Sequence, residues 1–294
     1  MSNAIRDRFD SQWDSQFINI ENQIANCPAY DIFPIFQKYI NKGSKILEAG
    51  CGAGRWLFYY HRNGYDIIGI DWSENTVDRI KSIDPSINVV SGDCSKTSFP
   101  DSYFGCILSL GTFEHNIEGP MAALNEAYRI LKAGGIMICT MPYLSPIRKI
   151  INYVKRPIRY LKARCYETRN TSATYTTLSH LIERTASYAC ASCYHGANGW
   201  EFFEYFFEHN VFNDLLIQSK FDILESNVAF PLDGLIVNLG SLVGSWDYVN
   251  GKPQFNLFGR IMRLLPRKMI SLHNVAVVRK RDFSIEKRLM TGKC

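Results

Sequence analysis

Residues 45–56 read Lys45-Ile-Leu-Glu-Ala-Gly-Cys-Gly-Ala-Gly-Arg-Trp56, and this stretch is the strongest indication of the fold. A short apolar run ends in an acid, Glu48, and three glycines spaced two apart follow it: Gly50, Gly52 and Gly54. Glycine adopts positive φ angles without strain, and it lets a ligand approach the backbone closely. We therefore predict a strand, a tight ligand-binding turn and a helix from Arg55 onward, whose first amide groups face the ligand.

The spacing of the glycines separates this loop from other nucleotide-binding loops. A dinucleotide loop reads G-x-G-x-x-G and a Walker loop ends in G-K-[ST], whereas this loop reads E-x-G-x-G-x-G. The pattern resembles motif I of the class I S-adenosylmethionine-dependent methyltransferases, of the type 11/12 kind. That resemblance implies S-adenosyl-L-methionine as cofactor and S-adenosyl-L-homocysteine as product. The loop would then pass beside the amino-acid tail of the cofactor, with Glu48 near it.

Further apolar runs follow at the spacing of alternating strands and helices. Residues 66–71 end in Asp71, about 20 residues after the loop, where nucleotide-binding sheets place a carboxylate on the ribose hydroxyls. We predict five more strands at 87–94, 104–110, 134–143, 221–229 and 274–279. Helical patterns are predicted at 73–81, 121–131 and 201–220. Strands alternating with helices indicate an α/β fold, a doubly wound and mostly parallel seven-stranded sheet.

The resemblance covers residues 44–143 and implies a Rossmann-like core there. Around it we expect an N-terminal helical cover (1–43), a lid or substrate insertion (144–200), the end of the same fold (201–283) with a helical insertion (230–272), and a tail (284–294). The implied cofactor-binding residues are Glu48, Gly50, Cys51, Gly52, Gly54, Asp71, Trp72, Asp93, Cys94, Leu110, Gly111 and Thr112. Trp72 would flank the adenine.

Glu114 and His115 follow the predicted fourth strand and are the catalytic candidates. Strand ends line the crevice of such sheets, and imidazole titrates near neutral pH, so His115 is suited to remove a proton from a hydroxyl acceptor. The other interpretation is that His115 only caps the backbone. A second group, His195, Glu204, Tyr205 and His209, is expected near the lid. No residue is assigned to a metal.

Composition limits the class of protein. The chain has 294 residues, 46% of them hydrophobic, and no run of 18 apolar residues that would suggest a membrane span. Its polar N-terminus does not resemble a signal peptide. Nine scattered cysteines indicate reduced thiols, so we expect a cytoplasmic protein. Cys190 and Cys193 form half of a zinc pattern without a second half nearby in sequence.

Basic residues are concentrated in two segments. Residues 146–164 hold seven bases and no acid, and residues 256–270 hold four bases and no acid. The rest of the chain has 22 bases against 28 acids, although the whole chain carries a net charge of +5. Both segments interleave bases with apolar residues, so they could contact an anionic membrane surface peripherally. Alternatively, they bury their apolar stripes on the domain and leave a solvated basic face.

The sequence leaves two other functions open. Tyr128 and Lys132 match the Y-x-x-x-K pattern of short-chain dehydrogenases, which would imply an NAD(P)-dependent oxidoreductase, but the first loop lacks dinucleotide spacing. The other is a methyltransferase-fold adaptor without activity. The N-P-P-[YF] motif of nucleic-acid methyltransferases is missing after the fourth strand, so no nucleic-acid partner is expected. We expect methyl transfer to a small or lipid-linked acceptor, on oxygen, such as a cell-surface glycan precursor.

Overall fold

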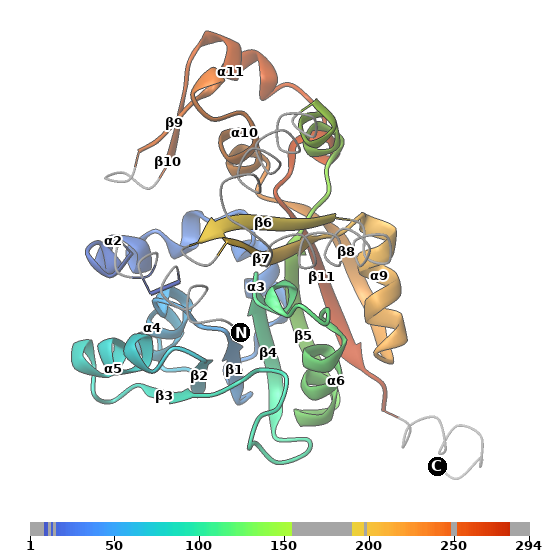
Figure 1. Cartoon of the computed structure of the whole chain (residues 1–294). Coiled ribbons are helices and arrows are strands. Elements are labelled where there is room, and N and C mark those ends of the chain that lie inside the picture. The colour runs from blue at the N-terminus through green and yellow to red at the C-terminus, as the bar shows by residue number, and fades with distance from the viewer. Residues whose placement is uncertain are drawn as a thin grey trace.

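A single seven-stranded sheet forms the centre of the molecule (Figure 1). The computed structural model describes residues 9–10, 13, 16–154, 190–196, 199–247 and 252–282. In spatial order the strands are β3 (Asn88–Ser91), β2 (Ile67–Asp71), β1 (Ile46–Ala49), β4 (Phe104–Leu110), β5 (Leu131–Pro142), β11 (His273–Lys280) and β8 (Phe221–Ala229). Pairing is parallel from β3 to β5, and β11 is antiparallel to both of its neighbours. This confirms the predicted mostly parallel, seven-stranded sheet.

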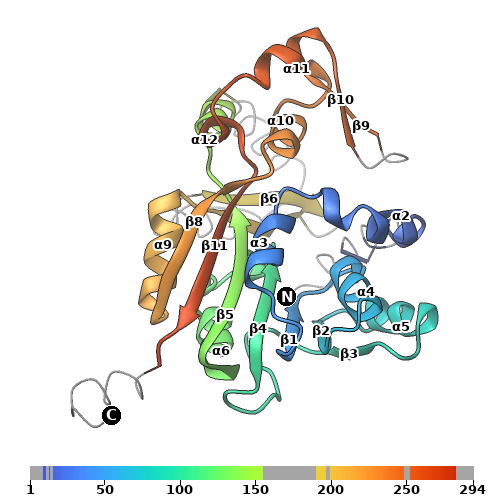
Figure 2. The same ribbon diagram turned by 180° about the vertical axis from the view of Figure 1, so that it is seen from behind.

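Helices cover both faces of the sheet (Figure 2). On one face α4 (Arg55–Arg62), α5 (Glu74–Ile83), α2 (Ile20–Ala25), the short helix Cys27–Ala29 and α3 (Phe33–Tyr39) pack into one apolar cluster. On the other face α6 (Met121–Ile130) and α9 (His209–Gln218) pack into a second cluster. The sheet is therefore buried on both sides, which explains why its central strands read as continuous apolar runs.

Local sequence signals account for where the first helices begin. Gly54 has φ +79° at the start of α4, a conformation that favours glycine. Ser73 caps α5, because its hydroxyl accepts a hydrogen bond from the amide of Thr76. Both helices thus begin directly after a strand end, which leaves their N-termini at the carboxyl edge of the sheet.

The topology brings one further strand end to that edge. Parallel strands β1, β2, β4 and β5 all point to it, and antiparallel β11 starts there, at His273. A hairpin of β6 (Cys190–Gly196) and β7 (Gly199–Phe206) crosses above the same edge (Figure 1). The carboxyl edge is therefore enclosed by the hairpin on one side and the helix N-termini on the other.

The predicted helix 201–220 is wrong in its first part. Residues up to Phe206 belong to strand β7, and the helix covers only His209–Gln218. The aromatic run between 202 and 207 has the 3–4 spacing of a helix face, but aromatics also favour strands, and here β7 pairs with β6. The third strand is likewise shorter than expected, since β3 ends at Ser91.

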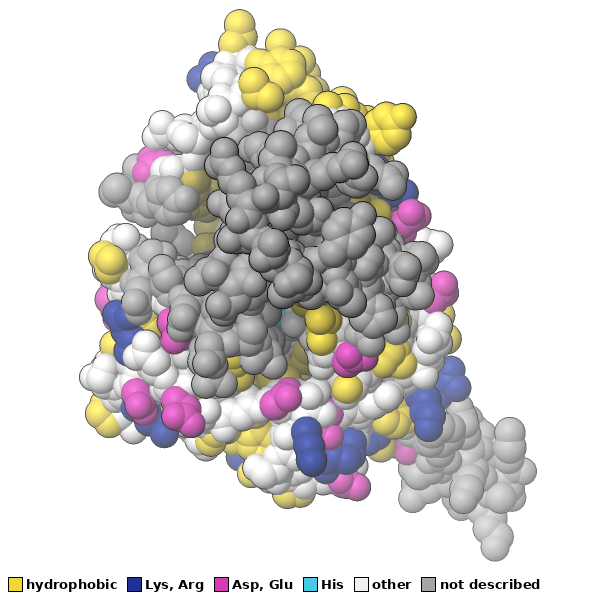
Figure 3. Space-filling view, viewed as in Figure 1, with side chains coloured by type: hydrophobic (Ala, Val, Ile, Leu, Met, Phe, Trp, Pro, Cys, Tyr) yellow, Lys and Arg dark blue, Asp and Glu magenta, His cyan; other side chains and the backbone are white. Residues whose placement is uncertain are grey.

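Residues 230–272 form a small unit beyond the carboxyl edge. It comprises α10 (Pro231–Leu239), the short helix Gly240–Leu242, the hairpin of β9 (Gly244–Asp247) and β10 (Lys252–Phe255), α11 (Leu257–Met262) and α12 (Arg267–Ile270). Its own apolar cluster includes Leu235, Val243 and Ile270, together with Ile147 from a helix at 146–154. Figure 3 shows hydrophobic side chains gathered on the outer end of this unit, over α11.

Within the described part of the chain, no helix combines the length and the apolar character that crossing a membrane requires.

Candidate active site

The glycine loop is held in place by two contacts with neighbouring strand ends. Gly50 has φ +71°, and a Cβ there would lie 2.3 Å from the Cγ2 atom of Thr112. The Thr112 hydroxyl donates a hydrogen bond to the carbonyl of Ala49 (3.0 Å), which ties the end of β4 to the end of β1. Gly50 is therefore required both by its backbone angle and by the closeness of Thr112.

Asp71, at the end of β2, fixes the next part of the loop. Its Oδ2 atom accepts a hydrogen bond from the amide of Gly52 (2.8 Å), and its Oδ1 atom accepts one from the amide of Ser73 (3.1 Å). The side chain is buried, and burial raises the pKa of Asp71 while these hydrogen bonds oppose the rise. The two hydrogen bonds thus fix the orientation of the Asp71 carboxylate toward the glycine loop.

Three buried polar atoms near the loop lack a hydrogen-bond partner among the residues that the structure describes: Oε2 of Glu48, Nε1 of Trp13 and Nε of Arg55. Burial raises the pKa of Glu48 to about 8, although Arg55 nearby opposes the rise. The ring of Trp13 lies over Gly52, since a Cβ at Gly52 would lie 2.9 Å from it. An acceptor and a donor, both desolvated, are what an amino-acid ligand with an ammonium and a carboxylate would use.

The N-terminal residues cover the crevice. Phe9 stacks on Phe203 with ring centroids 5.5 Å apart, and its ring meets those of His115 (4.9 Å) and Trp72 (6.0 Å) edge to face. Asp10 accepts a hydrogen bond from the Ser73 hydroxyl (2.6 Å). The described part of segment 1–43 therefore spans the space between the loop and the β7 strand.

His115 and Glu114 lie in a short 3-10 helix after β4 (Phe113–His115). The Nδ1 atom of His115 lies 2.8 Å from the carbonyl oxygen of Phe203, which can only accept a hydrogen bond, so Nδ1 carries the proton. The Nε2 atom then holds the lone pair in the neutral ring, 4.0 Å from Oε1 of Glu114. This is the tautomer that a general base or a metal ligand needs.

Glu114 is 1% exposed, and its Oε2 atom is without a hydrogen-bond partner in the described ranges. Burial raises the pKa of Glu114 well above its ordinary value, and the charge of Glu204 adds to the rise. Donor atoms of Glu114, His115 and Glu204 lie within 4.8 Å of one another. Side chains of these types suit a proton relay or a divalent cation. Glu204, which the sequence placed with His195, Tyr205 and His209, thus reaches the site from strand β7.

Reasoning from the sequence missed His273, the first residue of β11. A Cβ at Gly111 would lie 3.3 Å from Cε1 of His273 and 3.4 Å from Oε1 of Glu114. The side chains of His273 and Glu114 therefore both lie next to Gly111. The Nδ1 atom of His273 lies 3.3 Å from the Thr140 hydroxyl. Desolvation lowers the pKa of His273 to about 3, which keeps the ring neutral. Only the antiparallel direction of β11 places this residue at the edge, and no local motif signals it.

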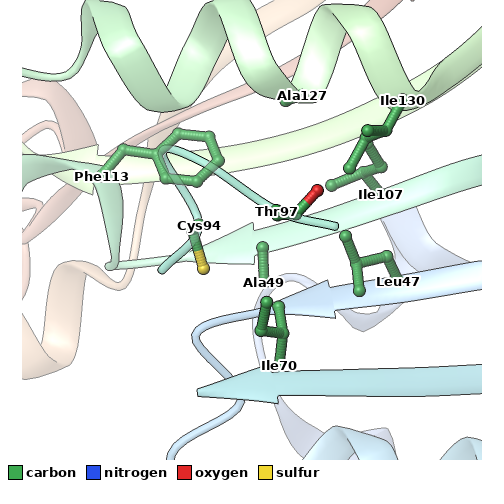
Figure 4. Close-up of a pocket in the computed structure, with 9 residues that line it drawn as sticks. All are labelled: Leu47, Ala49, Ile70, Cys94, Thr97, Ile107, Phe113, Ala127 and Ile130. Atoms are coloured by element: carbon green, nitrogen blue, oxygen red, sulfur yellow. The ribbon is translucent and has the colours of Figure 1, made fainter. Parts of the chain in front are cut away.

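The remaining predicted cofactor residues lie along the same edge. Asp93 is exposed and accepts hydrogen bonds from the amide and hydroxyl of Ser95 (both 2.7 Å), while Leu110 ends β4. Cys51 is buried in the loop, where burial raises the pKa of its thiol. Cys94 lines a small apolar cavity between the sheet and α6 (Figure 4). The other lining residues are Leu47, Ala49, Ile70, Thr97, Ile107, Phe113, Ala127 and Ile130.

Several other predicted residues lie apart from the crevice or outside the described side chains. His209 contacts Asn274 (2.9 Å) and Ser226 (3.3 Å) between α9, β11 and β8, and the Tyr205 hydroxyl donates to the carbonyl of Ile117. Tyr128 packs on Phe221 at the opposite edge of the sheet, which removes support for the oxidoreductase interpretation. The side chains of Cys190, Cys193 and His195 lie outside the described residues.

Comparison with known proteins agrees with this geometry. Residues 47–139 match the family model of a methyltransferase domain. Phosphoethanolamine N-methyltransferase 3 of Arabidopsis thaliana is 30% identical over 139 residues, 46% of this chain and 27% of that protein. A demethylmenaquinone methyltransferase of Staphylococcus aureus is 31% identical over 106 residues, 34% of this chain and 44% of the relative. The chain thus spans less than half the length of these two relatives.

Solved structures share the fold at lower identity. A Methanosarcina mazei S-adenosylmethionine-dependent methyltransferase is 16% identical with a TM-score of 0.53, over 85% of this chain and 99% of that one. The 1,6-didemethyltoxoflavin-N1-methyltransferase of Burkholderia thailandensis, solved with S-adenosylhomocysteine, is 13% identical with a TM-score of 0.51, over 95% and 88%. Residues 47–139 thus match a methyltransferase domain, and the sheet around them has the fold of these solved structures.

Proposed function

We propose that the chain binds S-adenosyl-L-methionine and transfers its methyl group to oxygen of a small or lipid-linked acceptor, with S-adenosyl-L-homocysteine as product. One observation carries the proposal: the amide of Gly52 in the glycine loop donates to the carboxylate of Asp71, and beside it lies the buried Oε2 atom of Glu48, which has no hydrogen-bond partner in the described part of the chain. A loop without phosphate-binding features, flanked by two buried carboxyls, suits a ligand with a ribose and an ammonium group.

The residues of the edge fit the parts of this cofactor. Glu48 would accept from the ammonium group, and the N–H of Trp13 would donate to the carboxylate. Asp71 would bind the ribose hydroxyls, and the loop glycines would let the backbone approach. Trp72, Asp93 and Cys94 would surround the adenine, and Cys51, Leu110, Gly111 and Thr112 would line the remaining contact surface. The cofactor supplies an electrophilic methyl group, and the protein aligns the acceptor and excludes water.

A hydroxyl acceptor must lose its proton as the new bond forms, and His115 is positioned to take it. The contact with the Phe203 carbonyl keeps the proton on Nδ1, so Nε2 is the ring nitrogen that would act as the base. The raised pKa of Glu114 favours its protonated form, which can hydrogen-bond but not take a proton. Glu114 would therefore orient the acceptor or His115, together with Glu204 and His273.

The acceptor class follows from the surroundings of His115. The aromatic rings of Phe9 and Phe203 pack against the imidazole, and flat apolar walls of this kind suit a sugar ring or a lipid head. We propose a cell-surface glycan precursor as one such acceptor, and peripheral contact with an anionic membrane through the segments 146–164 and 256–270. No nucleic-acid partner and a cytoplasmic location remain predictions from the sequence.

The first test is calorimetric titration of the purified chain with S-adenosyl-L-homocysteine, with NADH as control. We expect micromolar binding to the first and none to the second. Methyl transfer is then assayed with labelled S-adenosyl-L-methionine on glycan and lipid-linked acceptor pools. Binding of NADH alone would overturn the proposal, and cofactor binding without transfer to any acceptor would support the adaptor interpretation instead.

A further inference from the structure

The outer face of α11 is apolar although the helix is firmly packed on its inner face. Large side chains on the outer face and in the following turn are strongly exposed: Leu257 (77%), Phe258 (51%), Ile261 (57%) and Leu264 (84%). Leu242 (66% exposed) adjoins them, because its carbonyl accepts a hydrogen bond from the side chain of Asn256 at the start of α11. We call these five residues the α11 ridge.

Packing on the opposite side of α11 fixes the orientation of the helix and keeps the ridge exposed. Gly259, on the opposite side of α11, is buried so tightly that a Cβ there would lie 2.0 Å from the carbonyl oxygen of Val243. Asn256 caps the helix by accepting from the amide of Gly259 (2.8 Å), and Met262 and Leu265 pack into the cluster beneath. The helix is therefore anchored by its other side, and the ridge stays exposed.

Basic residues surround the ridge. Arg260, Arg263, Arg267 and Lys268 are all exposed, and long basic side chains can lie along apolar surface while their charges reach outward. Two acids contact this region: Asp31 pairs with Arg267 (2.6 Å), and Asp247 accepts a hydrogen bond from the side chain of Gln254 (2.8 Å). An apolar ridge with a positive margin is complementary to an anionic, apolar surface.

We propose that the α11 ridge inserts into the interface of an anionic phospholipid bilayer and holds the protein on the membrane. The ridge lies beyond the carboxyl edge of the sheet, at the end of the molecule where Figure 3 shows hydrophobic side chains gathered. Docking by this end turns the crevice of Asp71 and His115 toward the lipid. The inference rests on the membrane contact proposed above for 256–270 and names the residues that insert. Cofactor binding is measured separately with S-adenosyl-L-homocysteine, so a failure of membrane docking and a failure of cofactor binding are distinguishable.

The experiment is co-sedimentation of the full chain with vesicles of phosphatidylcholine with and without phosphatidylglycerol, at low and high salt. We expect retention on the anionic vesicles that weakens with salt. Leu264→Ser and Leu257→Ser should each lower the partition coefficient by about fivefold. Arg260→Glu should lower it by at least about fivefold at low salt. All three variants should keep the wild-type affinity for S-adenosyl-L-homocysteine.

Matched controls are available elsewhere on the surface. Ile217→Ser removes an apolar side chain of similar exposure (54%) on α9, and Lys132→Glu reverses an exposed charge at the opposite edge of the sheet. Both should bind vesicles like the wild type. Equal retention of ridge and control variants would overturn the proposal, as would absence of retention. Sedimentation velocity without vesicles adds a third outcome, because a dimer that Leu264→Ser dissociates would make the ridge a protein interface instead.

Discussion

The Nδ1 atom of His115 lies 2.8 Å from the backbone carbonyl of Phe203, a contact between residues 88 positions apart. It couples the strand end after β4 to the hairpin that crosses the crevice, and it selects the tautomer with its lone pair on Nε2. A carbonyl oxygen can only accept a hydrogen bond, so Nδ1 is the donor in this contact.

We predict that His115→Ala lowers the rate of methyl transfer by about 10²–10⁴-fold, the usual contribution of a general base. Affinity for S-adenosyl-L-homocysteine should change little, since the assigned role is on the acceptor side. Single-turnover kinetics with labelled methyl donor measure the rate. His209→Ala is the control, because that imidazole lies between α9, β11 and β8. Full activity of the His115 variant would remove it as the base.

Asp71→Asn should weaken S-adenosyl-L-homocysteine binding by roughly tenfold or more, as expected for the loss of a charged hydrogen-bond acceptor. The amide can keep one acceptor for Gly52 but loses the second carboxylate oxygen that serves Ser73 or the ribose. Calorimetry measures the affinity. Asp93→Asn, whose carboxylate is exposed and bonded to Ser95, should have a smaller effect. Equal effects of the two variants would contradict the assignment of the ribose to Asp71.

Glu48 makes the stability and the binding depend on pH. Burial raises its pKa from an ordinary 4.5 to about 8, so the folded state favours the protonated form. Between about pH 4.5 and pH 8 the unfolded chain has lost this proton while the folded chain still holds it. The free energy of unfolding should therefore fall as pH rises through that interval. Glu48→Gln removes this component, so its advantage in thermal stability over the wild type should grow across that interval.

An ammonium group beside Glu48 would favour its ionised form, so cofactor binding should release a proton. We expect wild-type affinity for S-adenosyl-L-homocysteine to increase between pH 6 and pH 8, with a slope that Glu48→Gln abolishes. Buffers of different ionisation enthalpy in the calorimeter measure the proton directly. An identical pH profile for both proteins would place the ammonium group elsewhere.

Gly50 and Gly134 provide a matched pair for the loop. Their φ angles are +71° and +72°, yet a Cβ at Gly50 meets Thr112 at 2.3 Å while one at Gly134 meets nothing within 4 Å. Alanine at either position carries the backbone strain, about 1 kcal/mol or more, and only Gly50→Ala adds the clash, about 1–3 kcal/mol. Chemical denaturation should show Gly50→Ala to be the less stable variant. Equal losses would mean that Thr112 moves aside at little cost.

Trp13→Phe tests whether the indole N–H serves the cofactor. The change keeps an aromatic ring over Gly52 and removes the donor that lacks a partner in the described chain. We expect binding of S-adenosyl-L-homocysteine to weaken by roughly tenfold or more, since a hydrogen bond to a charged group contributes about 1.5–3 kcal/mol. Tighter binding would show instead that the indole occupies the cofactor's place and must leave before it binds.

The central sheet was predictable from the sequence because buried parallel strands are short apolar runs that end in glycines and acids. The run 104–110 and the run 221–229 match β4 and β8 residue for residue, and the loop, Asp71 and His115 are adjacent to such runs. Chain order and a parallel sheet together bring these residues to one edge, so their location there followed from the sequence.

Tertiary structure alone decided what reaches that edge from distant segments. His273 joins the site because β11 runs antiparallel, Glu204 because its segment is a strand and not a helix, and Trp13 because the N-terminus packs back over Gly52. It also decided which apolar residues of 256–270 are covered: Met262 and Leu265 pack inward while Leu257 and Leu264 do not. Periodicity reports which residues share a face, whereas burial depends on what another part of the chain places against that face.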